Sequence, residues 1–237
     1  MSTISDPKNS KQDAPIQVSM PDVVKFVRQL GHDLRNHLNA AELQAAYLAE
    51  IVKDPEASDE IKRLRAMISQ VGASLQSVTV ALGQPRLMPM EYSAADFVAD
   101  LRQKLATEYP NETIQWDIQV GDASIEIDPQ ALQPAVIELF ANAFRHDSGE
   151  GPVVVEARIE NGQFVIFIRE PKRKFDHPTE NWGREPLQTI TQGHYGLGLH
   201  RSRAILEAHS GQLSARYDKG TSSLITKITL PLSNKRT

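Results

Sequence analysis

A long amphipathic pattern near the start of the chain constrains its fold more than any other feature. From about Asp22 to Lys53 no proline interrupts the sequence, and apolar residues recur at the spacing of one helix face, which predicts a single long helix. His32 lies about 160° from that face on a helical wheel, so we expect its imidazole to face solvent. The apolar face consists of Val27, Leu30, Leu34, Leu38, Ala41, Ala45, Leu48 and Val52.

A second amphipathic pattern follows after a turn at 54–57. Ser58 or Asp59 can cap this helix, and Gly83 and Pro85 can end it. Two long helices joined by a short turn predict an antiparallel hairpin, whose apolar stripe nothing in its own sequence covers. Pairing of two copies into a four-helix bundle would bury the stripe and predicts a homodimer, whereas packing of the hairpin on the rest of its own chain is the alternative.

The exposed side of the first helix carries residues suited to phosphoryl chemistry. Asp33 follows His32, and Asn36 lies one turn further along the helix. A neighbouring carboxylate can fix the tautomer of an imidazole and take up its ring proton while the other nitrogen attacks a phosphoryl group. His32 is therefore a candidate phospho-acceptor, although a histidine beside an aspartate is more often a solvated pair.

Charge, cysteine content and hydropathy exclude several classes of function. The formal net charge is −4, with acidic and basic residues interspersed, which argues against nucleic acid as the main partner. The absence of cysteine excludes disulfides, thiolate metal sites and cysteine catalysis. No apolar run approaches the ~20 residues of a membrane span and no signal peptide follows Met1, which predicts a soluble, cytoplasmic protein.

Three regions follow from composition and periodicity. Residues 1–20 are polar and predict a disordered leader, for which a separate sensor protein is a candidate partner. The helical hairpin spans 21–84, and 91–232 predicts an α+β domain with a mixed sheet covered by helices on one face. In this second domain we expect helices at 93–109, 129–146 and 196–209, and strands at 113–120, 124–127, 153–159, 163–169, 212–217 and 223–230.

A polar stripe lies on the expected helix at 129–146. Glu138, Asn142 and Arg145 recur at i, i+4 and i+7 opposite its apolar face, within reach of one ligand. An amide oxygen is a hard ligand for Mg²⁺, a guanidinium can fork onto phosphate, and a carboxylate can orient an attacking group. The stripe therefore suits a Mg²⁺–polyphosphate, although such a stripe is more often a solvated helix face.

A glycine-rich stretch leads into the last expected helix, after a polar segment at 171–195 that is too long for an ordinary connection. Glycines before a helix let the backbone approach a ligand closely and direct amide donors at an anion. The residues concerned are Gly193, Gly196, Leu197, Gly198 and Leu199.

In their order and spacing, these motifs resemble a bacterial two-component histidine kinase over 22–230. The resemblance implies a hairpin for dimerisation and histidine phosphotransfer, followed by an ATP-binding domain of the gyrase, Hsp90 and histidine kinase superfamily. The stretch His-Asp-Leu-Arg-Asn that begins at His32 resembles the phospho-acceptor box. By that resemblance His32 is phosphorylated, Asp33 is its acidic helper, and Asn36 positions water for dephosphorylating a partner.

Two further boxes extend the resemblance into the second domain. The segment 138–146 resembles the Glu-Leu-x-x-Asn-Ala box, in which Asn142 would hold Mg²⁺ and Glu138 would assist transfer to histidine. The segment 196–199 resembles the second glycine box, which contacts the phosphates beneath a lid. The resemblance implies ATP and Mg²⁺ as cofactors and a response regulator receiver domain as partner.

The first glycine box of the family is degenerate in this chain. The family has Asp-x-Gly-x-Gly after the strand that ends near Arg169, and that aspartate receives the adenine amino group. Here the stretch reads Glu-Pro-Lys-Arg-Lys from Glu170 to Lys174. Glutamate can accept the same hydrogen bond, but lysines at both glycine positions cannot easily adopt positive φ and they add bulk. The cations could contact phosphates instead, but an altered or lost nucleotide site is the simpler interpretation.

The acceptor box also departs from the family at one position. The family's usual proline is replaced by His37, which we expect to pack rather than to accept phosphate.

Two functions of different classes follow. In the first, the protein is a soluble histidine kinase that autophosphorylates His32 from ATP and transfers the phosphoryl group to an aspartate of a response regulator. In the second, it is a dimeric phosphotransferase or docking protein with a decayed ATP site, and His32 accepts phosphate from a regulator. A third, an ATPase of the same superfamily such as a serine kinase that antagonises a sigma factor, leaves the exposed histidine helix unexplained.

Overall fold

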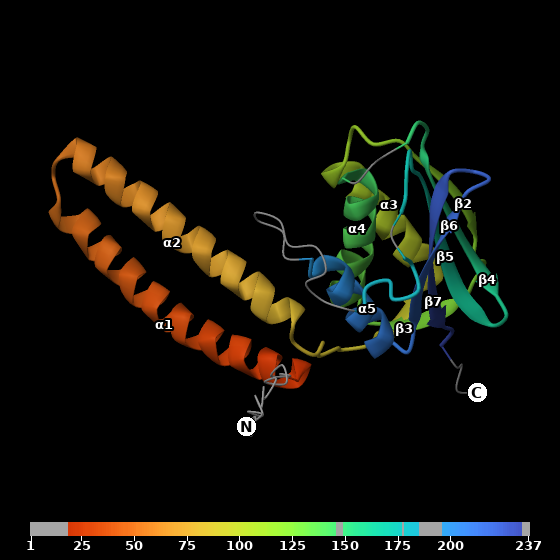
Figure 1. Cartoon of the computed structure of the whole chain (residues 1–237), viewed down its shortest axis with the longest axis horizontal. Coiled ribbons are helices and arrows are strands. Elements are labelled where there is room, and N and C mark those ends of the chain that lie inside the picture. Colours follow the sequence, from red (N-terminus) through yellow and green to blue (C-terminus); the bar gives the residue numbers. More distant parts are fainter. Residues whose placement is uncertain (1–18, 146–148, 177, 185–195, 234–237) are drawn as a thin grey trace, which may run out of the picture. The chain divides into compact units, whose positions relative to one another are not determined.

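The computed structural model describes residues 19–145, 149–176, 178–184 and 196–233, and the chain forms two compact units (Figure 1). The first unit extends to Thr79 and the second begins at Val80. A helical hairpin precedes a mixed sheet with helices, so the predicted α+β class is confirmed. In the part of the chain that is described, no helix is both long and apolar enough to cross a membrane.

The hairpin consists of α1 (Met20–Ile51) and α2 (Pro55–Ala81). Ser19 caps α1, because its hydroxyl oxygen accepts a hydrogen bond from the Asp22 amide at 3.3 Å. The cap expected for α2 at Ser58 or Asp59 is wrong. The cap lies four residues before Ser58, because Asp54 Oδ2 accepts the Ala57 amide at 2.8 Å. Pro55 begins the helix in its first turn, where its missing N–H costs nothing.

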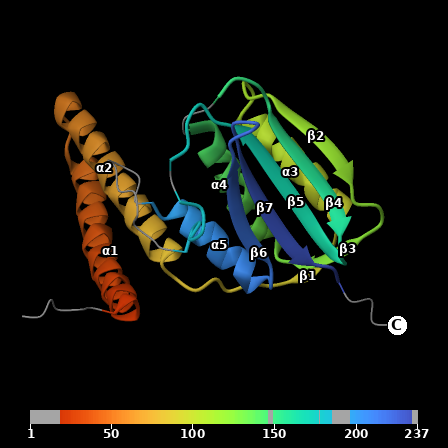
Figure 2. The ribbon, with the colours of Figure 1, turned by 45° about the vertical axis from the view of Figure 1, so that its right-hand side comes forward.

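The two helices of the hairpin lie side by side (Figures 1 and 2). Ala45 and Ile61 are buried between them, and Arg65 pairs with Glu42 at 2.7 Å. A β-carbon on Gly31 of α1 would lie 2.7 Å from the Thr79 hydroxyl of α2, so a larger residue there would force this side chain to move. The hairpin covers only part of its apolar surface. Large apolar side chains that stay exposed on it include Phe26, Leu30, Leu34, Leu43, Tyr47, Leu48, Ile51, Leu64, Met67 and Val71.

The second unit combines a five-stranded sheet, a two-stranded sheet and three helices. The large sheet has the order β2-β4-β5-β7-β6, in which β2 and β4 are parallel and all other neighbours are antiparallel. Strands β1 and β3 form the small antiparallel sheet. The strands are β1 (Met90–Ser93), β2 (Ile114–Gln119), β3 (Ser124–Ile127), β4 (Val153–Glu160), β5 (Gln163–Pro171), β6 (Gln212–Asp218) and β7 (Ser223–Pro231); the helices are α3 (Ala94–Glu108), α4 (Pro129–Arg145) and α5 (Gly198–Ala208).

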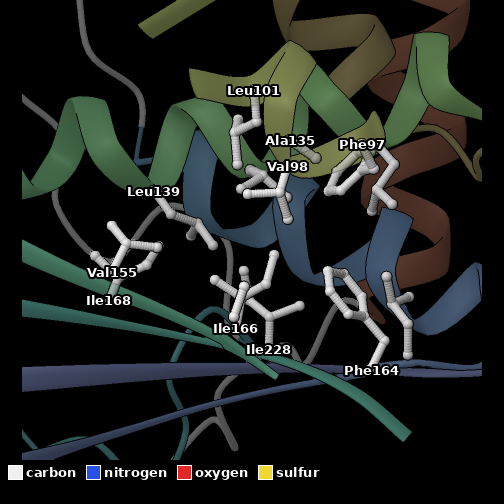
Figure 3. Packing of buried hydrophobic residues seen from close by; sticks show 14 of the residues in the cluster. Phe97, Val98, Leu101, Ala135, Leu139, Val155, Phe164, Ile166, Ile168 and Ile228 are labelled. Atoms are coloured by element: carbon white, nitrogen blue, oxygen red, sulfur yellow. The ribbon is translucent and has the colours of Figure 1, made fainter. Parts of the chain in front are cut away.

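Figure 2 shows the three helices on one side of the large sheet, as the sequence predicts. The core fills the space between the two layers, where Phe97 and Leu101 of α3 and Leu139 of α4 face Ile166 and Ile168 of β5 (Figure 3). Alternate residues of β5 point into this core because side chains in a strand alternate between its two faces. The register of β5 therefore decides which of its residues face the helices.

Three boundaries differ from the sequence-based expectations in ways that matter for the site. Strand β1 lies between the expected hairpin, which ends at 84, and the expected helix at 93–109, where no strand was expected, because its four residues are too short for a periodic signal. Helix α5 begins at Gly198, not at Gly196. Strand β5 runs to Pro171, beyond the expected end at Arg169, because its ladder with β7 continues through the pairs Glu170–Leu224 and Pro171–Ser223.

The first turn of α4 is fixed by Asp128. Its carboxylate accepts the amides of Gln130 at 3.0 Å and Ala131 at 3.2 Å, and also that of Met88 at 2.9 Å. These backbone hydrogen bonds, with that of Met88 the strongest, hold the pKa of Asp128 below its usual value. The Asp128 amide in turn donates to Nε2 of the buried His209 at 2.9 Å. One residue therefore joins the start of α4 to the linker before β1 and to the end of α5.

We expect Asp128→Ala to lower the free energy of unfolding by about 1 kcal/mol at neutral pH, since it removes a helix cap. Because the folded-state pKa is depressed, the stabilisation by the carboxylate is present above its ordinary value of 3.8 and is lost as pH falls through the lowered pKa. The difference between wild type and Asp128→Ala should therefore shrink in acid. Urea denaturation of both proteins over a range of pH measures it, and equal stability at neutral pH would contradict the assigned cap. Asp128→Asn is the matched control, because asparagine caps as well but does not titrate.

Candidate functional site

The exposed side of α1 holds the residues expected to form the acceptor site. The His32 side chain is 67% exposed and the Asp33 side chain 55%. His32 Nδ1 lies 3.2 Å from Asp33 Oδ1 and 3.5 Å from the Asn36 side-chain nitrogen. Gln29 donates to the same Asp33 oxygen at 3.0 Å and so steadies the carboxylate. Within the described part of the chain, His32 Nε2 has no hydrogen-bond partner, so the three predicted residues meet around one ring nitrogen and leave the other open.

His37 does not pack in the single hairpin. Its side chain is exposed, which contradicts the packing expected for it. Between His32 and this second histidine, Arg35 donates to Gln76 of α2, a contact that ties the acceptor turn to its neighbouring helix. Within the described residues, no carboxylate forms a hydrogen bond or ion pair with His37, whereas Asp33 contacts His32.

The polar stripe on α4 forms as the sequence predicts. Glu138 and Asn142 are half-buried and Arg145 is exposed, and Arg145 Nη1 lies 4.0 Å from Glu138 Oε1. The opposite face of the helix is buried in the core, with Leu132, Val136 and the other apolar residues against the sheet. Because that apolar face cannot rotate away from the core, the stripe is held in one direction.

The start of α5 lies against this stripe. A β-carbon on Gly198 would lie 2.8 Å from the Glu138 carboxyl carbon, so a larger residue there would displace the Glu138 carboxylate. One turn further along α5, the Ser202 hydroxyl donates to the Ala135 carbonyl at 2.8 Å and locks the two helices together. Ser202 was not singled out from the sequence, because a serine inside a helix carries no distinctive signal.

The first amides of α5 have no side-chain cap. Leu197, at the cap position, offers no side-chain acceptor, and Gly196 before it has a φ of +61°, a conformation that favours glycine. Uncapped amides at a helix start are donors available to an anion such as phosphate. Leu197 is buried, and Gly198 and Leu199 are half-buried. Gly193 and His146, which belong to the predicted boxes, lie outside the described residues.

Glu170, expected to meet a nucleobase, instead meets a lysine of its own segment. Its carboxylate oxygen Oε2 lies 2.8 Å from Lys172 Nζ, and the two residues are only 5% and 4% exposed. Burial raises the pKa of Glu170, and the Lys172 ammonium opposes that rise. The sequence gives no direct sign of this pair, since a lysine in a polar stretch is normally solvated.

The other lysine of the degenerate box behaves differently. Lys174 is 78% exposed and pairs with Asp176 at 2.5 Å. The Asp176 carboxylate raises the pKa of Lys174, the direction expected for a cation beside an anion. The two glycine positions of the family are thus filled by one buried lysine and one solvated lysine.

Two observations bear on cofactors. In the described ranges, no three histidine, aspartate or glutamate side chains gather as a metal cage, so a metal here would need oxygens from its ligand besides Asn142. A pocket of about 420 Å³ is lined by the last turn of α4, the start of β4 and Pro171. It adjoins Lys172 in sequence, but neither Glu170 nor Lys172 lines it.

The second unit matches a known protein family. Residues 127–234 match the family described as histidine kinase-, DNA gyrase B-, and HSP90-like ATPase. Over 209 residues the chain is 22% identical to the alginate biosynthesis sensor protein KinB of Pseudomonas aeruginosa, a match that covers 83% of this chain and 35% of the relative. The chain thus spans about a third of the length of that relative.

Solved histidine kinases share the fold of both units. The structure of full-length ShkA in complex with AMPPNP has a TM-score of 0.66 at 15% identity, covering 90% of this chain and 47% of that one. Histidine kinase ThkA in complex with the response regulator protein TrrA has a TM-score of 0.57 at 12% identity, covering 92% and 66%. The order of a helical hairpin and an ATPase domain is therefore shared along nearly the whole chain. Residues 127–234 thus match the histidine kinase-, DNA gyrase B-, and HSP90-like ATPase family, and the chain as a whole is similar to sensor histidine kinases in sequence and in fold.

Proposed function

We propose that this protein is a histidine kinase that autophosphorylates His32 from ATP and transfers the phosphoryl group to an aspartate of a response regulator. The observation that carries this proposal is the arrangement at His32, an exposed imidazole with Nδ1 beside Asp33 and with Nε2 open. ATP supplies the γ-phosphoryl group, and ADP leaves as the N–P bond forms. The family match at 127–234 supports ATP as the donor.

The residues around His32 have separate roles in this proposal. Asp33 holds the Nδ1–H tautomer, so that the lone pair on Nε2 is the nucleophile, and it stabilises the positive charge that the ring gains on attack. Asn36, also within reach of Nδ1, keeps a polar side chain beside the phosphorylated ring and can orient a water that dephosphorylates the regulator. Helix α1 therefore supplies only the groups that accept the phosphoryl group, and the groups that would hold ATP lie in the second unit.

The phosphate end of the donor fits the contact between α4 and α5. The uncapped amides of α5 are donors for a phosphate, and the Arg145 guanidinium supplies a cation at the end of the stripe. The Asn142 amide oxygen is the hard ligand for Mg²⁺, and Glu138 is the carboxylate that can orient the attacking group. Phosphoryl transfer needs such positioning and charge stabilisation more than covalent help from the protein.

Partners follow from the hairpin and from the relatives. The ThkA complex shows a kinase of this fold with a response regulator, which supports a receiver domain as partner. The exposed apolar stripe, including Leu30, Leu34 and Leu48, supports a homodimer, because a four-helix bundle would remove it from water. We place the dimer in the cytoplasm, where response regulators and ATP are present.

A second function is favoured by one observation. The pairing of Glu170 with Lys172 removes the acceptor that a nucleobase would use, which suits a phosphotransferase that takes phosphate at His32 from a regulator without ATP. Asn142 and the glycines at 196 and 198 favour the kinase. Measurement of ATP binding by calorimetry separates the two functions.

We expect Asn142→Ala to abolish autophosphorylation, because it removes the metal ligand, and to leave acceptance of phosphate from a phosphorylated regulator intact. Labelling of the purified protein with radioactive ATP, and separately with the phosphorylated regulator, measures both routes. Gln130→Ala, an exposed change on the same helix, is the control and should keep both. Normal labelling of Asn142→Ala by ATP would refute its assigned role.

We expect His32→Ala to abolish labelling by both routes, since the nucleophile is lost. His37→Ala is the matched control, because it changes an exposed histidine of the same helix and should retain labelling. Any label that survives in His32→Ala, located by peptide mapping, would exclude His32 as the acceptor.

We expect the full chain to sediment as a dimer and Leu48→Lys to sediment as a monomer, because a charge would have to be buried without a partner in the bundle. Glu50→Lys changes charge on the solvated side of α1 and should remain dimeric. Analytical ultracentrifugation measures all three proteins, and a monomeric wild type would show that the hairpin stripe is covered in another way.

A further inference from the structure

We propose that Lys172 is an internal occupant of the nucleobase end of the ATP site, and that its side chain fills the space a base would need beside the Glu170 carboxylate. This inference rests on the proposed ATP-dependent function and names how the same site is restrained. It begins from the buried ion pair of Glu170 and Lys172, the two polar residues that β5 and its extension place in the interior.

The direction of the Lys172 side chain follows from the strand that carries it. Ile166, Ile168, Glu170 and Lys172 are alternate, buried positions, whereas Phe167, Arg169 and Pro171 between them are less buried. Ile166 and Ile168 point toward the helices (Figure 3). Since side chains alternate along a strand, Glu170 and Lys172 continue the same face, toward the layer that contains α4.

The backbone at Lys172 is held as an extension of this strand. Its amide donates to the Ser222 carbonyl at 2.9 Å, one step beyond the last β5–β7 pair at Pro171 and Ser223. A glycine at position 172 would place no side chain on the face of β5 that points toward the helices. In this chain the lysine stem and ammonium fill that side.

The segment after α4 packs against the backbone that carries Lys172. The Gly149 amide donates to the Pro171 carbonyl at 2.8 Å, and a β-carbon on Gly149 would lie 3.0 Å from the Lys172 backbone nitrogen. These contacts hold the end of β5 in place, and the two members of the pair are only 5% and 4% exposed.

The ammonium supplies the contact that an amino group of a base would supply. A carboxylate in this place can receive an amino donor, and Lys172 Nζ already lies 2.8 Å from it. An ion pair between charged partners is stronger than a contact between a carboxylate and a neutral amino group. The buried lysine side chain also fills the space beside the carboxylate, so a base can reach Glu170 only when Lys172 withdraws. Withdrawal leaves a buried carboxylate without its cation, which is costly.

Occupancy by Lys172 weakens the binding of ATP but does not abolish it. When only a fraction of molecules has the lysine withdrawn, the apparent Kd rises by the inverse of that fraction. A pair that is closed in about nine molecules of ten would weaken binding about tenfold. Lys174 takes no part, because it is solvated and paired with Asp176.

Binding of Mg²⁺-ATP to the full chain, measured by calorimetry and by displacement of a fluorescent nucleotide, tests the proposal. We expect Lys172→Gly to lower the Kd about tenfold or more relative to wild type. Lys172→Met loses the same charge but keeps most of the volume, so it should gain far less. Lys174→Gly, the other lysine at a family glycine position, should bind as wild type does.

A double variant serves as the control for misfolding, because it leaves no unpaired charge in the interior. Glu170→Gln combined with Lys172→Gly leaves no unpaired carboxylate, and it should also bind ATP more tightly than wild type if space at position 172 is what the site lacks. Thermal unfolding checks that each variant is folded. Unchanged affinity in both glycine variants, or an equal gain in Lys172→Met and Lys172→Gly, would overturn the proposal.

Labelling of His32 separates this inference from the proposed function. If Lys172→Gly binds ATP tightly and His32 is not labelled, occupancy by Lys172 holds and the kinase function fails. If wild type and Lys172→Gly bind ATP equally and both label His32, the kinase function holds and the internal occupant is refuted.

Discussion

The packing of α4 between the sheet and α5 is the constraint on which the second unit depends. Its apolar face closes the core against β5, and that fixed face determines where Glu138, Asn142 and Arg145 point. On the same helix, the Glu138 carboxylate lies where a β-carbon on Gly198 would be, and the Ala135 carbonyl accepts a hydrogen bond from Ser202 of α5. A helix that is free to turn would bring neither the stripe nor the uncapped amides of α5 to one place. Stability and the candidate phosphate site are therefore consequences of one packing arrangement.

Periodic features of the sequence predict most of the fold because they depend on local physics. The two long helices, the caps at Ser93 and Asp128 and the hairpin turn at Asn161 and Gly162 follow from spacing, capping and positive φ. The start of α2 was misplaced because Asp54 and Pro55 form a stronger start signal than Ser58, a preference that is readable from sequence once proline is placed in the first turn. Strand β1 was missed because it is defined by its partner β3 rather than by its own four residues.

The candidate site was predictable where its residues share one element and less so where they do not. His32, Asp33 and Asn36 meet because i, i+1 and i+4 positions of a helix are neighbours. The approach of Gly198 to Glu138 joins positions sixty residues apart and depends on tertiary packing. The burial of Lys172 is harder still to predict from sequence, because it requires β5 to continue past its expected end at Arg169. Hydrogen bonding with β7 causes this extension. The local preferences of Glu170 and Pro171 give no sign of it.

The two ion pairs of interest differ in their exposure to solvent, and under the proposed function this difference would let the acceptor and donor sites be controlled separately. His32 and Asp33 lie in solvent, where a pair contributes little stability and can rearrange during a reaction at low cost. Glu170 and Lys172 lie in the interior, where separating the charges is expensive. Under the proposed function, the acceptor would react without such a cost, whereas a nucleobase would have to displace a buried cation. A change that lowers the cost of this displacement, such as a regulator or sensor that moves the end of β5, would raise ATP affinity without altering any residue at the acceptor.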